Sequence, residues 1–231
     1  MNRLSVGDRI GAACGAAYVA LILVGNSLAT GNGQQSNDPT GQQVLQYADQ
    51  AAHSTVARVG QGMELLGFVA LAFFLGWLVP ALRRAGGSAP WLSTVVLVGG
   101  IGTLAVKVAT IAPESAIGAG SQQLDPAIAK GLYDVSGAGF VISFLPFAIL
   151  MLGLGASVLT SGFLGRFAGW SAMLLGVAAL VVVATAQSLD ANPMPFLLGL
   201  LWILVASIRL AWRGPRQVRV PAAEGLTAAL A

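Results

Sequence analysis

Long runs without a charged residue alternate with short polar segments along most of the chain. No charged residue lies between Arg9 and Asp38, and five further gaps downstream are similarly free of charge. Each gap can hold a helix of about 17–25 residues, the length that crosses a bilayer. Because lipid offers the backbone no hydrogen bonds, helices are the expected structure of these segments. The pattern predicts six transmembrane helices, near residues 10–30, 60–81, 91–112, 132–159, 167–188 and 194–212.

The composition supports the same class of protein. Hydrophobic residues make up 56% of the chain and charged residues only 9%, with a mean hydropathy of +0.78. An ordinary soluble domain carries about 25% charged residues, so this chain has too few to cover a globular surface. We therefore expect an all-α integral membrane bundle, with one transmembrane domain at residues 1–213 and a short tail at residues 214–231.

The distribution of lysine and arginine predicts the orientation in the membrane. With six spans, both termini lie on one side, and that side carries nine of the twelve basic residues. The positive-inside rule therefore places both termini and the tail in the cytoplasm. Four tryptophans lie near the same ends of their helices, as an interfacial aromatic belt would. The basic residues on that side are Arg3, Arg9, Arg83, Arg84, Arg166, Arg209, Arg213, Arg216 and Arg219, and the tryptophans are Trp77, Trp91, Trp170 and Trp212.

Two longer connections lie on the opposite, outer side. In the first, residues 31–57, an Asp-Pro pair at 38–39 is a typical helix start and is followed by small and apolar residues at helical spacing. This predicts a short amphipathic helix, which either covers the bundle as a lid or lies passively at the interface. The second connection, residues 113–131, repeats the start signal with an Asp-Pro pair at 125–126. We expect a helix to begin there, before the fourth span.

Small residues and prolines lie inside the spans. Gly11 and Gly15 form a GxxxG pattern, which lets helix backbones approach closely in lipid. Pro146 lies in the middle of the fourth span, where it removes the hydrogen bond to the carbonyl of Ile142. We expect a kink there, which either serves helix packing alone or opens a hinge or cavity.

A carboxylate and an ammonium group interrupt the second and third spans. Glu64 lies about four residues inside the second span, about 6 Å from its outer end, and Lys107 lies about 7–8 Å from the outer end of the third. The two helices are joined by a short cytoplasmic turn, so we expect them to be antiparallel neighbours. Their matched depths predict a salt bridge between Glu64 and Lys107.

Further polar residues share this level of the predicted bundle. Thr103, Thr110 and Glu114 recur with Lys107 at helical spacing on one face of the third span, and Asp134 begins the fourth. Ionisable residues in spans usually face the bundle interior and often mark function. One interpretation is an outward-opening cavity that binds a small molecule or a lipid headgroup, and the other is a buried ion pair that fixes helix register. The candidate ligand-binding residues are Glu64, Thr103, Lys107, Thr110 and Asp134.

The residues that usually carry catalysis or bind metals are sparse. His53 is the single histidine and Cys14 the single cysteine, so neither a bis-histidine site nor an internal disulfide can form. No nucleophile with an adjacent base and no phosphate-binding loop is recognisable, so the sequence favours a non-enzymatic role and identifies no cofactor. The net charge of +3 follows from topology and anionic lipid, and gives no support to nucleic-acid binding.

Two stretches resemble a known group of proteins. The segments "GMELLGFVALAFFLGWLVPALRR" and "SGFLGRFAGWSAMLLGVAALV" are similar to a family of six-span bacterial membrane proteins whose domain has no assigned function. The resemblance implies a six-span protein of the bacterial cytoplasmic membrane and no activity, and the Ala/Gly-rich composition resembles that of actinobacterial proteins. The residues that carry it are Glu64, Arg83, Arg84, Ser161, Arg166 and Trp170.

Three functions are compatible with these features. The first is a non-enzymatic membrane protein whose outer polar cluster binds a small molecule or lipid headgroup. The second is an accessory subunit of a larger complex, for example a substrate-binding component of an importer, which such a six-helix chain resembles. Its partner subunits would contact Gly/Ala-rich helix faces, such as that of Ala12, Ala16 and Ala20. The third is a lipid-modifying membrane enzyme.

Overall fold

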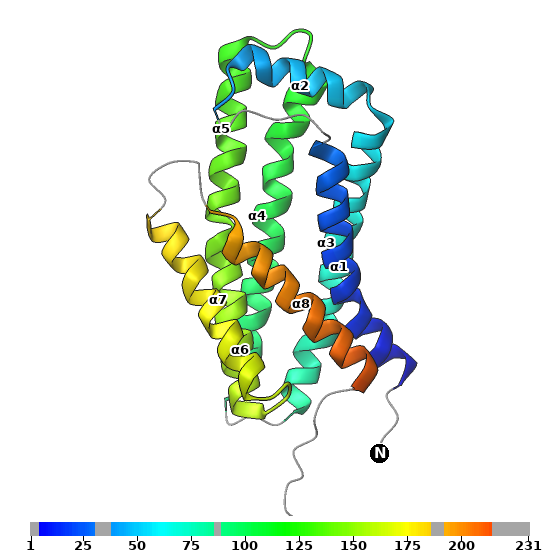
Figure 1. Cartoon of the computed structure of the whole chain (residues 1–231), viewed down its shortest axis with the longest axis vertical. Coiled ribbons are helices and arrows are strands. Elements are labelled where there is room, and N and C mark those ends of the chain that lie inside the picture. The colour runs from blue at the N-terminus through cyan, green and yellow to red at the C-terminus, as the bar shows by residue number, and fades with distance from the viewer. Residues whose placement is uncertain (1–4, 31–37, 86–88, 186–191, 214–231) are drawn as a thin grey trace, which may run out of the picture.

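The computed structural model describes residues 5–30, 38–85, 89–185 and 192–213, and the predicted tail at residues 214–231 lies outside these ranges. Within them the chain consists of α-helices and turns without a strand, which confirms the predicted all-α fold (Figure 1). The helices are α1 (Val6–Thr30), α2 (Gly41–His53), α3 (Thr55–Arg84), α4 (Leu92–Gly120), α5 (Pro126–Ile142), α6 (Phe144–Ser161), α7 (Arg166–Thr185) and α8 (Met194–Arg213).

Six segments of the described chain are long and apolar enough to cross a bilayer: α1, α3, α4, α5 together with α6, α7, and α8. The chain is therefore a multi-pass membrane protein with the predicted number of spans. We call the end of the bundle where α1 begins and α8 ends the terminal end, and the end that α2 crosses the α2 end (Figure 1).

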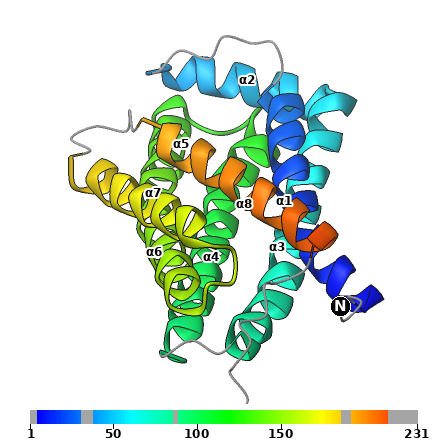
Figure 2. The same cartoon turned by 60° about the horizontal axis from the view of Figure 1, so that its bottom comes forward.

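The spans form two packed groups joined by α8. α1 packs chiefly against α3, whereas α4 packs against α6 and α5, and α6 packs against α7. α8 crosses the bundle obliquely and reaches α1 (Figures 1 and 2). Between the two groups lies a core of large apolar side chains, each at most 1% exposed, which includes Leu71, Phe144, Phe147 and Ile203.

Glycines allow α1 and α3 to pack closely along much of their length. A side-chain carbon at Gly11 would collide with the ring of Trp77, and one at Gly15 would collide with side chains of α3 and α8. Nearer the α2 end, Gly25 of α1 faces Gly60 of α3, and a side-chain carbon on either would meet backbone atoms of the other helix. The GxxxG pattern of α1 is thus used within the chain, for helix packing.

The fourth span is interrupted close to its proline. α5 ends at Ile142, Ser143 forms a turn, and α6 begins at Phe144, two residues before Pro146. Pro146 lacks an N–H and its ring crowds the carbonyl of Ile142, which accounts for the interruption. The kink expected there stays a prediction. The predicted start of α5 is confirmed, because the Asp125 carboxylate accepts a hydrogen bond from the N–H of Ala127 at 2.7 Å.

α3 and α4 are longer than the sequence indicated. α3 begins at Thr55 rather than near residue 60, and α4 continues to Gly120 rather than ending near residue 112. Pro113 does not end α4, because the turns after it are held in place by packing: Ile117 is 4% exposed and contacts α2 and α5. Glu64 and Lys107 therefore lie about 14 Å and 20 Å from the α2-end termini of their helices, farther from those ends than predicted.

α2 is a real helix, but it begins later than the Asp-Pro pair at 38–39. Thr40 caps it: the N–H of Gln43 donates to the Thr40 hydroxyl, and the Gln43 side chain accepts from the N–H of Thr40 at 2.8 Å. At the other end, Ser54 ends α2 with its backbone and caps α3 by accepting from the N–H of Ala57 at 3.2 Å. One residue thus separates the two helices.

α2 lies across the end of the bundle (Figures 1 and 2). Its buried side chain, Val44, packs on Ile117 of α4 and Ala129 of α5 in a small core separate from the main one. Of the two expectations for this helix, the structure shows the one in which it covers the bundle.

Candidate functional site

Lys107 points from α4 towards two aromatic rings. Its ammonium nitrogen lies 3.9 Å from the ring centroid of Phe140 on α5 and 4.7 Å from that of Phe196 on α8. A cation over a ring face is attracted by the electron-rich face of the ring, and the attraction grows when water is excluded. Lys107 is partly buried, so the two phenylalanines replace part of its hydration shell. Three helices meet at this contact.

The predicted salt bridge between Glu64 and Lys107 is not formed. None of the ion pairs within the described ranges includes either residue, so their charged atoms lie more than 4.0 Å apart. Glu64 instead faces α1, where it lies beside Asn26 and the backbone of Gly25. The prediction was wrong because α4 turns Lys107 towards α5 and α8, and α3 packs chiefly against α1.

A second carboxylate, Glu114, belongs to the same region. The hydroxyl of Ser136 on α5 donates to Glu114 Oε1 at 2.7 Å and also approaches the carbonyl of Thr110 at 3.3 Å. Glu114 and Glu64 both act electrostatically on the Lys107 ammonium. Glu114 lies seven residues after Lys107 on the same helix face, and that spacing is the sequence signal that identifies it as a site candidate.

We call the three charged groups Glu64, Lys107 and Glu114, with their neighbours Asn26, Ser136, Phe140 and Phe196, the Lys107 cluster. It joins side chains from α1, α3, α4, α5 and α8. Its two carboxylates and one ammonium group influence each other electrostatically without closing an ion pair. The cluster therefore presents separated charges of both signs within the bundle.

The hydroxyl groups of Thr103 and Thr110 donate hydrogen bonds to carbonyl groups of their own helix. Thr103 is 1% exposed and donates to the carbonyl of Gly99 at 2.8 Å, and Thr110 donates to the carbonyl of Lys107 at 2.7 Å. Such back-bonding satisfies a hydroxyl in an apolar setting. The structure thus places Thr110 next to the Lys107 cluster and Thr103 in the packed interior, one turn before Lys107 on α4.

Asp134 belongs to a separate group of charges under α2. It accepts a hydrogen bond from Lys130, one turn earlier on α5, and Lys130 also pairs with Asp38 at 2.9 Å. Asp38 precedes α2, so these contacts help to hold α2 against α5. Asp134 is therefore not brought together with Glu64 and Lys107, and the structure places it with the residues that fasten α2.

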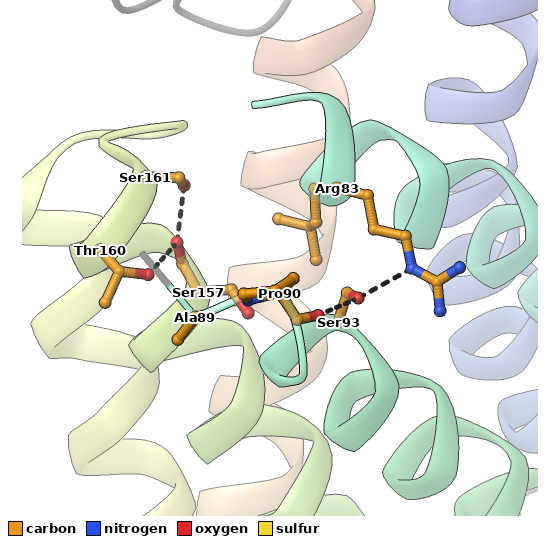
Figure 3. Close-up of a pocket in the computed structure, with 8 residues that line it drawn as sticks. Arg83, Ala89, Pro90, Ser93, Ser157, Thr160 and Ser161 are labelled. Carbon is orange, nitrogen blue, oxygen red and sulfur yellow. Dashed lines mark hydrogen bonds between the residues drawn. The ribbon is translucent and has the colours of Figure 1, made fainter. Parts of the chain in front are cut away.

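A small polar cavity lies at the terminal end of the bundle, between the α3–α4 connection and the end of α6 (Figure 3). Arg83 donates to the Ser93 hydroxyl at 3.0 Å on one side, and Ser161 donates to the carbonyl of Ser157 on the other. The Ser157 hydroxyl is buried without a hydrogen-bond partner among the described residues. With a volume of about 30 Å³, the cavity suits a bound water and is too small for an organic ligand.

In the described part of the chain, no three histidine, cysteine, aspartate or glutamate side chains gather closely enough to hold a metal ion. The comparisons with known proteins were made for the whole sequence. No family model, curated protein or solved structure matches this chain, so the family it resembles stays a prediction and the site rests on its own geometry.

Proposed function

We propose that this chain is a non-enzymatic membrane protein that binds a small molecule or lipid headgroup at the Lys107 cluster. The observation that supports this role is the state of Lys107: its ammonium lies on the rings of Phe140 and Phe196, while two carboxylates act on it from outside ion-pair distance. A purely structural ion pair gains most when its charges are in contact and fully hydrogen-bonded. Charges held apart remain available to a ligand.

The cluster favours a ligand that carries both an amine and an acidic group. The carboxylates of Glu64 and Glu114 match an ammonium group, and the Lys107 ammonium matches a carboxylate or phosphate. Glu64 and Glu114 influence each other, so a cation between them would relieve their repulsion. A zwitterionic headgroup such as phosphoethanolamine has this chemistry, and so do small zwitterions in solution.

The orientation completes the proposal. From the excess of arginine near the terminal end we infer, by the positive-inside rule, that this end faces the cytoplasm, in a bacterial inner membrane. The Lys107 cluster would then lie in the half of the bundle that faces the outside, below α2. The resemblance to six-span bacterial proteins, and to actinobacterial composition, agrees with this location.

The accessory-subunit alternative needs a Gly/Ala-rich helix face that is free to contact a partner. Gly11, Ala12 and Gly15 of α1 are buried, and both glycines lie against side chains of α3 or α8. Ala13, Ala17 and Ala20 are exposed at helical spacing, so a different face of α1 is the one open to a partner. A lipid-modifying enzyme would need a nucleophile beside a base, and the cluster offers only the Ser136 hydroxyl, which donates to Glu114 Oε1 and approaches the carbonyl of Thr110.

The test is native mass spectrometry of the purified protein after incubation with phosphatidylethanolamine, and separately with phosphoethanolamine. We expect a bound adduct on the wild-type chain that is lost in Lys107→Met and in Glu64→Gln. The matched control is Arg58→Gln, which removes an exposed charge from α3 near the same end.

Two results would contradict the proposal. One is an adduct that all variants retain equally, or that the wild-type chain never shows. The other is a collapse of thermal stability in Lys107→Met, because loss of one partner of a buried structural pair costs about 3–5 kcal/mol. That outcome would support a helix clasp instead.

A further inference from the structure

An open apolar groove runs along the side of the bundle between α1 and α3, far from the Lys107 cluster. Its volume is about 480 Å³. Ile10 and Phe73 are 60% and 68% exposed, so they stand at its edges rather than filling it. The residues that line it are Gly7, Ile10, Gly11 and Cys14 of α1 and Ala72, Phe73, Gly76 and Trp77 of α3.

Tight packing fixes the shape of this groove. The Trp77 ring rests on Gly11, where a side-chain carbon would collide with it. The Trp77 indole N–H donates to Asp8 Oδ1 at 3.1 Å, which holds the ring in one orientation. By contrast, Gly76 has no atom within 4 Å of the place where its side chain would begin. The space above Gly76 is therefore part of the groove. Its shape is fixed by the packed and hydrogen-bonded ring of Trp77.

One end of the groove carries a guanidinium group. Arg84 lies two helical turns beyond Trp77 on the same face of α3, and its Nη2 lies 3.6 Å from Asp8 Oδ1. Its Nε donates to the carbonyl of Pro80 at 3.3 Å, and 66% of its side chain is exposed. The contact with Asp8 keeps the guanidinium beside the groove mouth, with N–H groups left to donate elsewhere.

The other arginine at this end of α3 is held differently. Arg83 donates from its Nε to the hydroxyl of Ser93 on α4, so it points away from the groove (Figure 3). Arg9 is exposed on the first turns of α1, about 100° around the helix from Ile10 and outside the groove lining. Among the described arginines of α1 and α3, Arg84 is thus the one beside the groove mouth.

We propose that the groove binds one acyl chain of an anionic phospholipid, whose phosphate is bound by Arg84. The walls are apolar and face the bilayer, so an acyl chain fills them without loss of hydrogen bonds. The positive-inside rule places this end of the bundle at the cytoplasmic leaflet, where anionic lipids attract basic residues. A guanidinium binds phosphate through two parallel hydrogen bonds, and phosphatidylglycerol lacks the choline cation that Arg84 would repel, so the site prefers the anionic headgroup.

This proposal is independent of the proposed function, since it concerns another face and the other end of the bundle. The proposal concerns one lipid bound at a specific site, which differs from the layer of exchangeable lipids that surrounds any membrane protein. A coat lipid exchanges freely and shows no preference for one groove, whereas a lipid in a fixed groove survives purification and depends on named residues.

The experiment uses the full chain reconstituted in vesicles of phosphatidylcholine and phosphatidylglycerol with identical acyl chains. After extraction into mild detergent, native mass spectrometry counts the lipids that remain on each protein molecule. Gly76→Leu fills the groove, and Gly62→Leu is its matched control, because Gly62 lies on the same helix and also has open space around it. Arg84→Gln removes the phosphate-binding group, with Arg83→Gln as its control.

We expect one phosphatidylglycerol to remain on the wild-type chain and on both controls. Gly76→Leu should lose it, and Arg84→Gln should lower the preference for phosphatidylglycerol over phosphatidylcholine about tenfold, as expected for a charge-assisted hydrogen bond. Circular dichroism and thermal unfolding check that all four variants fold.

Three outcomes would overturn the proposal. Retention of the lipid by Gly76→Leu would place it elsewhere, and an unchanged lipid preference in Arg84→Gln would remove the role of the guanidinium. A dimer of this chain that Gly76→Leu dissociates would show that a second copy, and not a lipid, occupies the groove.

Discussion

The contact between Gly25 and Gly60 offers a sharp test of how α1 and α3 pack. A side-chain carbon built on Gly60 would lie 2.5 Å from the backbone nitrogen of Ala29 and 2.6 Å from the carbonyl oxygen of Gly25. Ordinary contacts of such a carbon are 3.4–4 Å. Because the colliding atoms are backbone, no side chain can swing aside, and Gly60→Ala must push the helices apart by about 1 Å.

The cost of that separation can be estimated from packing energies. A gap of about 1 Å forfeits a quarter to a half of the dispersion attraction between the atoms on its two sides. Overpacking at a well-packed contact typically costs about 1–3 kcal/mol. Against this, alanine gains about 0.5–1 kcal/mol over glycine through helix propensity. The net effect of Gly60→Ala is a loss of stability, and its size depends on how well α1 can shift.

A matched variant removes the propensity term. Gly62 lies two residues further along α3 and has no atom within 4 Å of its side-chain position. Gly62→Ala gains the same propensity without a collision, so the difference in unfolding free energy between the two variants isolates the helix contact. We expect Gly60→Ala to be less stable than Gly62→Ala by about 1–3 kcal/mol.

The assay is thermal unfolding in detergent at equilibrium, monitored by circular dichroism. The wild-type chain is the reference. Gly60→Ala should melt at a lower temperature than the wild type, and Gly62→Ala at the same temperature or higher. Equal stability of the two variants would refute the close backbone contact. A secondary readout is the Lys107 cluster, because Glu64 is one turn from Gly60 and its position should shift with α1.

Two further predictions concern residues whose roles the structure reassigns. Thr103→Val should change the unfolding free energy by less than about 1 kcal/mol, because the Thr103 hydroxyl donates only to a carbonyl of its own helix. Native mass spectrometry should show unchanged retention of phosphatidylethanolamine. Loss of the bound lipid would show that Thr103 takes part in binding. Val44→Ala should weaken the packing of α2 by about 1–2 kcal/mol and so speed hydrogen exchange of the α2 amides roughly five- to thirtyfold, with α6 unaffected; equal changes in both helices would show that α2 does not open on its own.

The features that the sequence predicts well are those that depend on local chemistry. The six spans follow from charge-free runs of bilayer length, because the bilayer imposes both limits. The start of α5 follows from the Asp125 cap, and the break before Pro146 follows from the missing N–H. Each of these outcomes depends on a few neighbouring residues, so no knowledge of the tertiary arrangement is needed.

The features that it misses depend on which helices become neighbours. Sequential helices joined by a short turn suggested that Glu64 and Lys107 would meet, but α3 packs chiefly against α1. Lys107 meets Phe140 and Phe196, and the latter lies on α8, 89 positions later in the chain. Nothing in a helical-face argument indicates that contact, because an aromatic residue in a span is ordinary. The extension of α4 past Pro113 was missed for the same reason, since Ile117 is held by other helices.

Ser54 has a mechanical consequence. It ends α2 with its backbone and begins α3 with its hydroxyl, so a single residue in the extended conformation separates the two helices. A displacement of α2 therefore acts directly on the first turn of α3. Any force that lifts α2 from α4 and α5 is transmitted as a torque to the beginning of α3. The same helix carries Glu64 less than three turns later, so the outer surface and the interior of the bundle are coupled through a single serine.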